Sequence, residues 1–93
     1  MLKVNEYFNG TVKSIALANA EGTATVGVME AGEYEFGTST KEYMTVISGS
    51  ITTLLPGEKE WKTFKKGETF IVEKNEKFKV KMTEQTAYYC KYE

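Results

Sequence analysis

Apolar and polar residues alternate with a period of two in several segments of the chain. Residues 77–82 alternate between lysine and a large apolar side chain, which predicts a strand with one buried and one solvated face. Over residues 23–28 the alternation sets Ala24, Val26 and Val28 against small or polar residues. It predicts a strand that turns these three apolar side chains inward.

Two further apolar runs, residues 44–47 and 70–72, are continuous and predict strands that are covered on both faces. Turn signals separate the strands every 8–12 residues or so, with one wider gap, as in antiparallel all-β domains. These signals are Asn9-Gly10, Glu21-Gly22, Ala31-Gly32, Ser48-Gly49-Ser50, Pro56-Gly57, Lys66-Gly67 and Lys74-Asn75-Glu76. We therefore expect one domain over residues 1–93, an all-β barrel or jelly roll of about eight or nine antiparallel strands.

The composition removes several kinds of chemistry. All 12 basic residues are lysine, all 13 acidic residues are glutamate, and histidine is absent. A Ser-His-Asp triad, a histidine general base and a bidentate arginine clamp each need a missing residue type. Without imidazole, and with Cys90 as the only thiol, a metal site would have to consist of glutamate and backbone oxygen, which suits only hard cations such as calcium or magnesium. We expect no zinc, copper or iron site and no cofactor.

Size and charge narrow the expected partners. A 93-residue chain buries only about 60–65% of the surface that its unfolded form exposes, so we expect self-association as a homodimer. The net charge of −1, with lysine and glutamate interspersed, provides no basic patch for nucleic acid or a membrane surface. A single cysteine, and the absence of a signal-peptide pattern or a long apolar run, lead us to expect a cytoplasmic protein.

Two stretches keep the spacing of the two cupin motifs without the metal-binding histidines. In the first, which runs from Gly27 to Gly49, Tyr34-Glu35-Phe36 occupies the place of the H-x-H pair and Glu42 that of the cupin glutamate. In the second, which begins at Gly67, the pattern places Phe78 where the last histidine stands. The sequence thus resembles a cupin whose metal pocket has become an aromatic one.

A closer resemblance extends from one end of the chain to the other. It is carried by Asn5-Glu6-Tyr7-Phe8, Val12-Lys13-Ser14-Ile15, Val26-Gly27-Val28-Met29, Gly32-Glu33-Tyr34, Met44-Thr45-Val46-Ile47-Ser48-Gly49 and Tyr89-Cys90-Lys91-Tyr92. These phrases resemble the small bacterial pyrimidine/purine nucleoside phosphorylase family, a cupin-type group. The resemblance implies phosphorolysis of purine and pyrimidine nucleosides to the free base and α-D-ribose 1-phosphate, with inorganic phosphate as co-substrate.

Within this resemblance, four residues are candidates for the nucleoside. Tyr34, Phe36 and Phe78 would stack on the base, and such stacking tolerates many bases because every base has a π-face. Glu42, the candidate catalytic residue, would hydrogen-bond the ribose hydroxyls and stabilise the positive charge of the transition state. We expect a metal-independent reaction of broad base range.

The co-substrate must be held without arginine or histidine. Lysine, hydroxyl and backbone N–H donors remain, and the candidates are Lys13, Ser14, Thr38 and Lys91. Lys91 stands where we expect an arginine in the family, so a bidentate fork is replaced by a point charge.

Each candidate also has a structural interpretation. The aromatic residues are ordinary core of a small β domain, Glu42 and the lysines are solvated charges, and residues 38–41 form a turn. At the level of function, the alternative is a non-catalytic cupin that binds a small sugar- or nucleoside-like metabolite in its barrel. A binder of single-stranded nucleic acid fits less well, because residues 77–82 place their lysines and apolar side chains on opposite faces.

Overall fold

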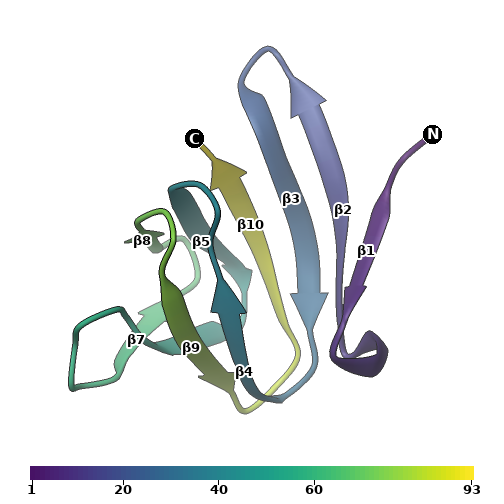
Figure 1. Ribbon diagram of the computed structural model, residues 1–93. Helices are drawn as coiled ribbons and strands as arrows, with labels where there is room; N and C mark the ends of the chain where they lie inside the picture. The colour runs from purple at the N-terminus through teal and green to yellow at the C-terminus, as the bar shows by residue number, and fades with distance from the viewer.

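The computed structural model describes all 93 residues and consists of antiparallel strands joined by turns (Figure 1). The strands are β1 (Val4–Tyr7), β2 (Val12–Asn19), β3 (Gly22–Met29), β4 (Gly32–Gly37), β5 (Glu42–Ser48), β6 (Ser50–Leu54), β7 (Lys62–Lys65), β8 (Thr69–Val72), β9 (Lys77–Met82) and β10 (Thr86–Tyr92). A short 3-10 turn, η1 (Phe8–Gly10), follows β1. The all-β prediction is confirmed. There are ten strands rather than eight or nine, since four-residue strands such as β7 leave little periodicity to detect.

The strands form two sheets. The larger sheet has the order β1-β2-β3-β10-β5-β8 and the smaller has the order β4-β9-β6-β7. The sheets face each other as in a cupin-like jelly roll but do not close into a barrel (Figure 1). At one open side, β1 and η1 of the larger sheet lie against β4 through aromatic contacts.

The core lies between the sheets and draws on both. Its members with almost no exposed surface are Val12, Met29, Val46, Ile51, Val72 and Val80. In β9, Phe78, Val80 and Met82 are buried while the three intervening lysines are exposed, which confirms the alternation predicted for residues 77–82. Burial of each such aliphatic side chain stabilises the fold by about 1.5–3 kcal/mol.

The orientation predicted for β3 is wrong. Thr25, Gly27 and Met29 face inward, whereas Val26 and Val28 are 42% and 48% exposed on the outer face. Gly27 faces inward because the ring of Tyr88 lies across it, and a Cβ atom there would be 2.6 Å from the phenol carbon Cζ. The period of two is right, but of the three residues predicted to face inward only Ala24 is buried.

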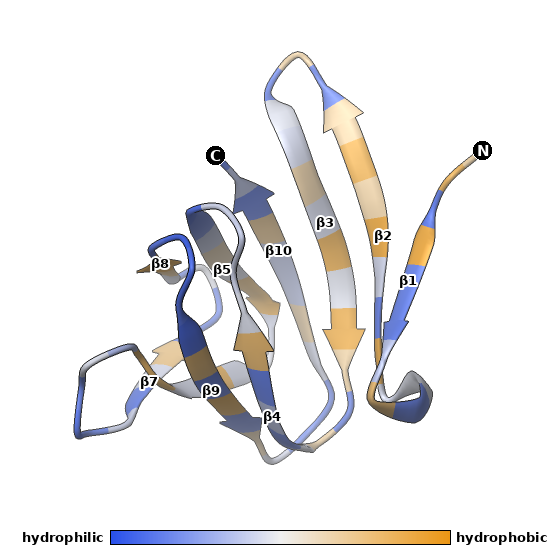
Figure 2. Ribbon diagram, viewed as in Figure 1, coloured by the Kyte–Doolittle hydropathy of each residue, from blue (hydrophilic) through white to orange (hydrophobic).

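The outer face of the larger sheet therefore carries an apolar row. Val4, Ile15 and Val26 are exposed and stand side by side in register on β1, β2 and β3, and Tyr89 of β10 continues the row. Figure 2 shows the apolar bands along β2 and β3. The prediction that both continuous apolar runs are covered on both faces is also wrong, because Ile47 of β5 and Ile71 of the edge strand β8 are exposed.

The ends of the larger sheet differ in how far they are covered. The hairpin of β2 and β3 extends beyond the smaller sheet, which lies on the side of β10 and β5 (Figure 1).

The structure contains no helix of the length and apolarity that a membrane crossing requires.

Candidate functional site

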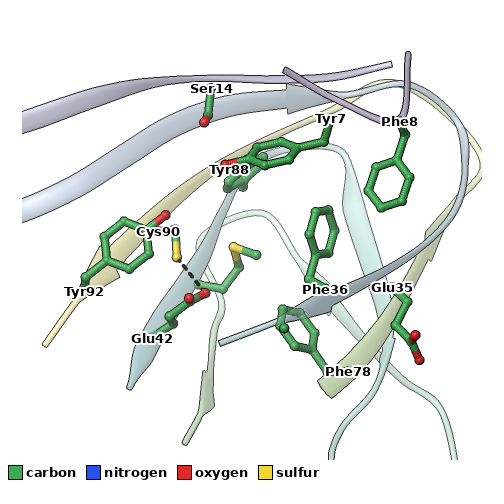
Figure 3. Close-up of a pocket in the computed structure, with 12 residues that line it drawn as sticks. Tyr7, Phe8, Ser14, Glu35, Phe36, Glu42, Phe78, Tyr88, Cys90 and Tyr92 are labelled. Carbon is green, nitrogen blue, oxygen red and sulfur yellow. Dashed lines mark hydrogen bonds between the residues drawn. The ribbon is translucent and has the colours of Figure 1, made fainter. Parts of the chain in front are cut away.

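A cavity of about 390 Å³ opens between the two sheets (Figure 3). Six strands and η1 contribute to its wall. The lining residues are Tyr7, Phe8, Ser14, Glu35, Phe36, Gly37, Glu42, Met44, Phe78, Tyr88, Cys90 and Tyr92. Its size is within the range of about 300–1,000 Å³ usual for small-molecule sites. Four of the residues predicted from the sequence, Ser14, Phe36, Glu42 and Phe78, meet here.

One end of the cavity is aromatic, and Phe36 is at its centre. The Phe36 ring lies 5.9 Å from that of Phe78, 5.5 Å from that of Phe8 and 6.4 Å from that of Tyr7, all centroid to centroid. Tyr34 does not line the cavity. Its ring supports Phe8 and Phe36, and its hydroxyl donates to the backbone oxygen of Glu30 at 2.8 Å.

The turn after β1 holds Phe8 in this cluster. Phe8, Asn9 and Gly10 have φ angles of 52°, 57° and 84°, so three successive residues adopt the left-handed conformation. For a residue other than glycine this conformation costs about 1–2 kcal/mol. Sequence reasoning identified the Asn9-Gly10 turn but missed Tyr7 and Phe8, since nothing local shows that this turn brings β1 against β4.

The other end of the cavity is polar and is built largely by β10. Tyr88, Cys90 and Tyr92 alternate along this strand, so all three point inward beneath Ser14 of β2 (Figure 3). The Tyr92 hydroxyl shares a hydrogen bond of 3.0 Å with that of Thr25. The final phrase of the sequence carried the family resemblance, but no inward face was predicted for it, although the period of two groups these three residues on one face.

Tyr88 is held in place by two neighbours. Gly27 leaves room for its ring, as described above, and Ser14 forms a hydrogen bond with its phenol. Burial raises the pKa of Tyr88 to about 12, although the hydrogen bond with Ser14 opposes the rise. Asn5 donates to Ser14 Oγ at 3.4 Å from the adjacent strand. At neutral pH Tyr88 is therefore a neutral donor of a hydrogen bond.

Glu42 supplies the carboxylate of the polar end. Its Oε1 accepts a hydrogen bond of 3.4 Å from Cys90 Sγ (Figure 3). Burial raises the pKa of Glu42, and the hydrogen bond from Cys90 partly offsets this effect. Burial, and then the charge of Glu42, raise the pKa of Cys90, so this thiol is not an activated nucleophile.

The predicted lysines lie away from the cavity. Lys13 alternates with Ser14 on β2, so it points to the outer face, where its ammonium is 3.3 Å from Glu6. Lys91 alternates in the same way between Cys90 and Tyr92 and is exposed. No lysine lines the cavity.

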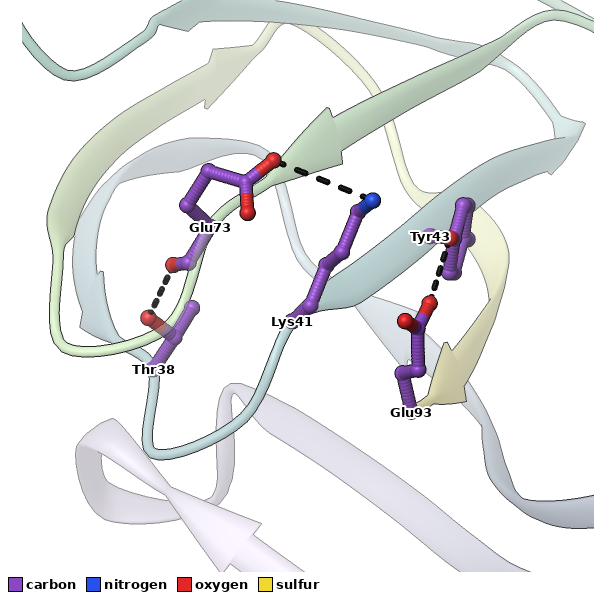
Figure 4. A network of polar contacts seen from close by, with 5 residues as sticks. All are labelled: Thr38, Lys41, Tyr43, Glu73 and Glu93. Carbon is purple, nitrogen blue, oxygen red and sulfur yellow. Dashed lines mark hydrogen bonds and ion pairs between the residues drawn. The ribbon is translucent and has the colours of Figure 1, made fainter.

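Thr38 also lies outside the cavity and joins two loops (Figure 4). It is buried, its hydroxyl donates to the backbone oxygen of Glu73 at 2.7 Å, and it accepts from the backbone N–H of Glu76 at 3.0 Å. Lys41 beside it is 3.9 Å from the Glu73 carboxylate. This network fixes the turn before β5, which carries Glu42 at its first position.

The chain offers no obvious metal centre, because no three Cys or Glu side chains cluster anywhere in it. At the cavity, Glu42 and Cys90 meet as a pair. The chemistry available at the polar end is that of one carboxyl group and hydroxyl donors, and the other end offers aromatic surfaces.

Comparison with known proteins agrees with this arrangement. Residues 2–92 match the family model described as pyrimidine/purine nucleoside phosphorylase. Curated proteins of that name from Shewanella pealeana and Pseudomonas fluorescens (strain Pf0-1) are 62% and 59% identical over 92 residues, which is 99% of this chain and 99% and 98% of theirs.

Solved structures show the same fold. A protein of unknown function from Vibrio parahaemolyticus superposes with a TM-score of 0.96 at 42% identity, covering 100% of this chain and 99% of that one. The cupin domain of Cnp3 from Schizosaccharomyces pombe, at 18% identity, shares the fold with a TM-score of 0.69 over 98% of this chain and 69% of that one. The full-length match to the family model and to relatives near 60% identity shows that the chain belongs to the pyrimidine/purine nucleoside phosphorylase family.

Proposed function

We propose that the protein transfers the ribosyl group of a nucleoside to inorganic phosphate, releasing the free base and α-D-ribose 1-phosphate. The observation that carries this proposal is the division of one cavity into an aromatic end and an end with a carboxyl group and hydroxyls. A nucleoside has the same division, with a flat base at one end and a polar sugar at the other. The names of the close relatives support the reaction class.

The aromatic end accepts the base. Phe36 and Phe78 offer ring surfaces, Tyr34 supports Phe36, and Tyr7 and Phe8 close the open side. Stacking accepts any base, whereas sharp discrimination requires buried polar groups matched to the edge of one base. We therefore propose a broad range that includes adenosine, guanosine, inosine, xanthosine, cytidine, uridine and thymidine.

The polar end holds the sugar and phosphate. Glu42 hydrogen-bonds the ribose hydroxyls and faces the carbon that gains positive charge, which lowers the energy of the transition state. Ser14, Tyr88 and Tyr92 line the same cavity and provide hydroxyls for phosphate. Three further candidates influence phosphate only from a distance. They are Lys13 and Lys91 on the outer face and Thr38 in the loop network. The reaction proposed here uses no metal.

A direct assay tests the proposal. The purified protein is incubated with each nucleoside, with and without phosphate, and free base and ribose 1-phosphate are measured by chromatography. We expect products only when phosphate is present, and a loss of product formation in Glu42→Ala. Absence of products with every nucleoside would overturn the proposal.

The alternative is a non-catalytic cupin that binds a sugar- or nucleoside-like metabolite. The absence of lysine from the cavity favours it, because a phosphate dianion finds no cation there. Nucleoside binding that is seen by calorimetry, without turnover in phosphate, would support this alternative.

We also propose a homodimer formed through the outer face of the larger sheet. Six strands about 4.8 Å apart and on average about six residues long present an area on the order of 600 Å², about three quarters of the roughly 800 Å² that each partner contributes to a standard interface. Val4, Ile15 and Val26 form its exposed apolar centre. A second copy fits this face because a two-fold axis brings the same row against itself.

Cys90 is free and buried, which agrees with the reducing cytoplasm that we propose as the location.

A further inference from the structure

The interior of the cavity combines one carboxyl group with no positive charge. Glu42 is the only ionisable carboxyl group at its polar end. Glu35, at the rim, is exposed and stands opposite Lys79 on β9, so solvent and a neighbouring ammonium compensate its charge. A phosphate dianion that entered beside an ionised Glu42 would place three negative charges in a partly desolvated space.

None of the groups that face Glu42 can neutralise it. It accepts a hydrogen bond from Cys90, and the other residues that line the polar end with it are Tyr88 and Tyr92 of β10 and Ser14 of β2, none of which carries a positive charge. Its one hydrogen bond comes from a thiol, which is a weak donor.

The nearest lysine in the sequence, Lys41, is directed elsewhere. Its ammonium interacts with Glu73 and with the ring of Tyr43, 5.3 Å from the ring centroid, outside the cavity. Burial also raises the pKa of Glu42, which agrees with a carboxyl group that protonates readily.

We propose that the cavity binds phosphate together with one proton, that Glu42 carries this proton, and that Glu42 passes it to the leaving base. This inference rests on the proposed function for its last step. A protonated Glu42 removes the like charge and becomes a hydrogen-bond donor toward phosphate. The site thus replaces the missing cation by a proton.

The step balances in atoms and electrons. A phosphate oxygen forms a bond to C1′ of the ribose as the bond from C1′ to the base nitrogen breaks, and the electron pair of that bond stays on the base. Glu42 donates its proton to the base as this bond breaks and becomes a carboxylate, so its negative charge develops while C1′ carries positive charge. The proton that hydrogen phosphate brought then passes from the new phosphate ester to Glu42, which restores the carboxyl group. No redox partner is involved.

Sulfate is the decisive probe, because it remains a dianion at neutral pH and any proton taken up on binding must go to the protein. Isothermal titration calorimetry in buffers of different ionisation enthalpy measures that number of protons. For the wild-type protein at a pH above the pKa of Glu42, we expect close to one proton per sulfate and an affinity that falls about tenfold per pH unit.

Two variants locate the proton. Glu42→Gln keeps the shape and a neutral donor, so we expect sulfate binding with no proton uptake and an affinity independent of pH. Glu35→Gln, the matched control at the rim, retains the uptake seen in the wild type. Thermal melts of both variants establish that they fold.

Three outcomes overturn the inference: no sulfate or phosphate binding to the wild type, binding without proton uptake, or uptake that persists in Glu42→Gln. Binding without uptake points instead to a cation from a second copy. The chromatographic assay separates this inference from the proposed function. Turnover by the wild type without proton uptake refutes only the inference, whereas uptake without turnover refutes the phosphorolysis.

Discussion

On part of the larger sheet, small and polar side chains face inward and apolar side chains face solvent, which is the reverse of the usual distribution. Across β2 and β3 the inner face carries Ser14, Thr25 and Gly27, while the outer face carries Ile15 and Val26. In the smaller sheet the ordinary rule holds, with apolar residues of β9 inside and its lysines in water. At one end of this inner face Val12 and Met29 belong to the core, whereas Ser14 lines the cavity and Gly27 makes room for Tyr88, and the outer face has the composition of an interface.

The difference shows why burial alone does not identify core. Tyr88 and Cys90 are almost as buried as the aliphatic residues of β9, yet they line the cavity with Glu42. Changes on the inner face should therefore affect activity, and changes on the outer face should affect assembly.

The largest expected effect is on the inner face, at the carboxyl group. Glu42→Gln cannot pass a proton to the leaving base, and loss of general acid catalysis typically costs about 10²–10⁴-fold in rate. We expect kcat for every nucleoside to fall by that order, measured by product formation under saturating phosphate. Glu35→Gln serves as the control and should retain most of the activity. Equal activity in Glu42→Gln and the wild type would remove Glu42 from the chemistry.

Gly27→Ala should give the next largest effect. The new Cβ would lie 2.6 Å from Tyr88 and 2.8 Å from the backbone oxygen of Lys13, so ring and strand must both shift. We expect a loss of about 1–3 kcal/mol in the free energy of unfolding, measured by urea denaturation, and reduced activity.

Gly37→Ala is the matched control for this change. Its Cβ would approach nothing closer than 3.8 Å, so its stability should stay near that of the wild type. A Gly27→Ala protein as stable and as active as the wild type would show that the position of Tyr88 is not critical.

An outer-face change should separate assembly from folding. Val26→Lys places an ammonium at the centre of the apolar row, where an unpaired charge would be desolvated in a dimer. We expect at least about a tenfold weaker dimer by analytical ultracentrifugation, with the stability of the monomer changed by no more than about 0.5 kcal/mol. Thr63→Lys adds the same charge on exposed β7 and should leave the dimer intact. A dimer unaffected by Val26→Lys would place the interface elsewhere.

A smaller effect concerns stability and pH on the inner face. Burial raises the pKa of Glu42 in the folded protein above its ordinary value of 4.5. Between these two pKa values the folded state holds a proton that the unfolded state releases. The free energy of unfolding therefore falls as the pH rises from 4.5 through the pKa of folded Glu42. Above that window, Glu42→Gln should melt at a higher temperature than the wild type. The difference should disappear below pH 4.5. Calorimetric scans across pH test this, and a constant difference would contradict it.

The smallest effects should come from outer-face lysines. Lys13→Ala removes an exposed ion pair with Glu6, for which about 0–1 kcal/mol is typical. We expect its KM for phosphate to stay within about twofold of the wild type, because Lys13 and Ser14 point to opposite faces of β2. A much larger KM would return Lys13 to the phosphate site, and Lys91→Ala provides the same test on β10.

The sequence predicted some parts of the site better than others. The cupin spacing predicted that Tyr34, Phe36, Phe78 and Glu42 share one lumen. Phe36, Glu42 and Phe78 line the cavity, whereas Tyr34 lies behind Phe36. The spacing missed Tyr88 and Tyr92, although their alternation with exposed residues is visible. The charge of Lys13 and Lys91 made them candidates for phosphate binding. The sequence does not show on which face of the sheet a strand residue lies, because this depends on long-range contacts.

The sequence by itself determined the strand class, the period of two, the family and the absence of histidine and arginine chemistry. Only the tertiary structure decided which face of β3 is inside, because a period of two divides a strand into two faces without ordering them. That order depends on what the opposite sheet and the neighbouring strand present. Tyr88 needs the space above Gly27, so the glycine face turns inward and the valine face remains on the surface.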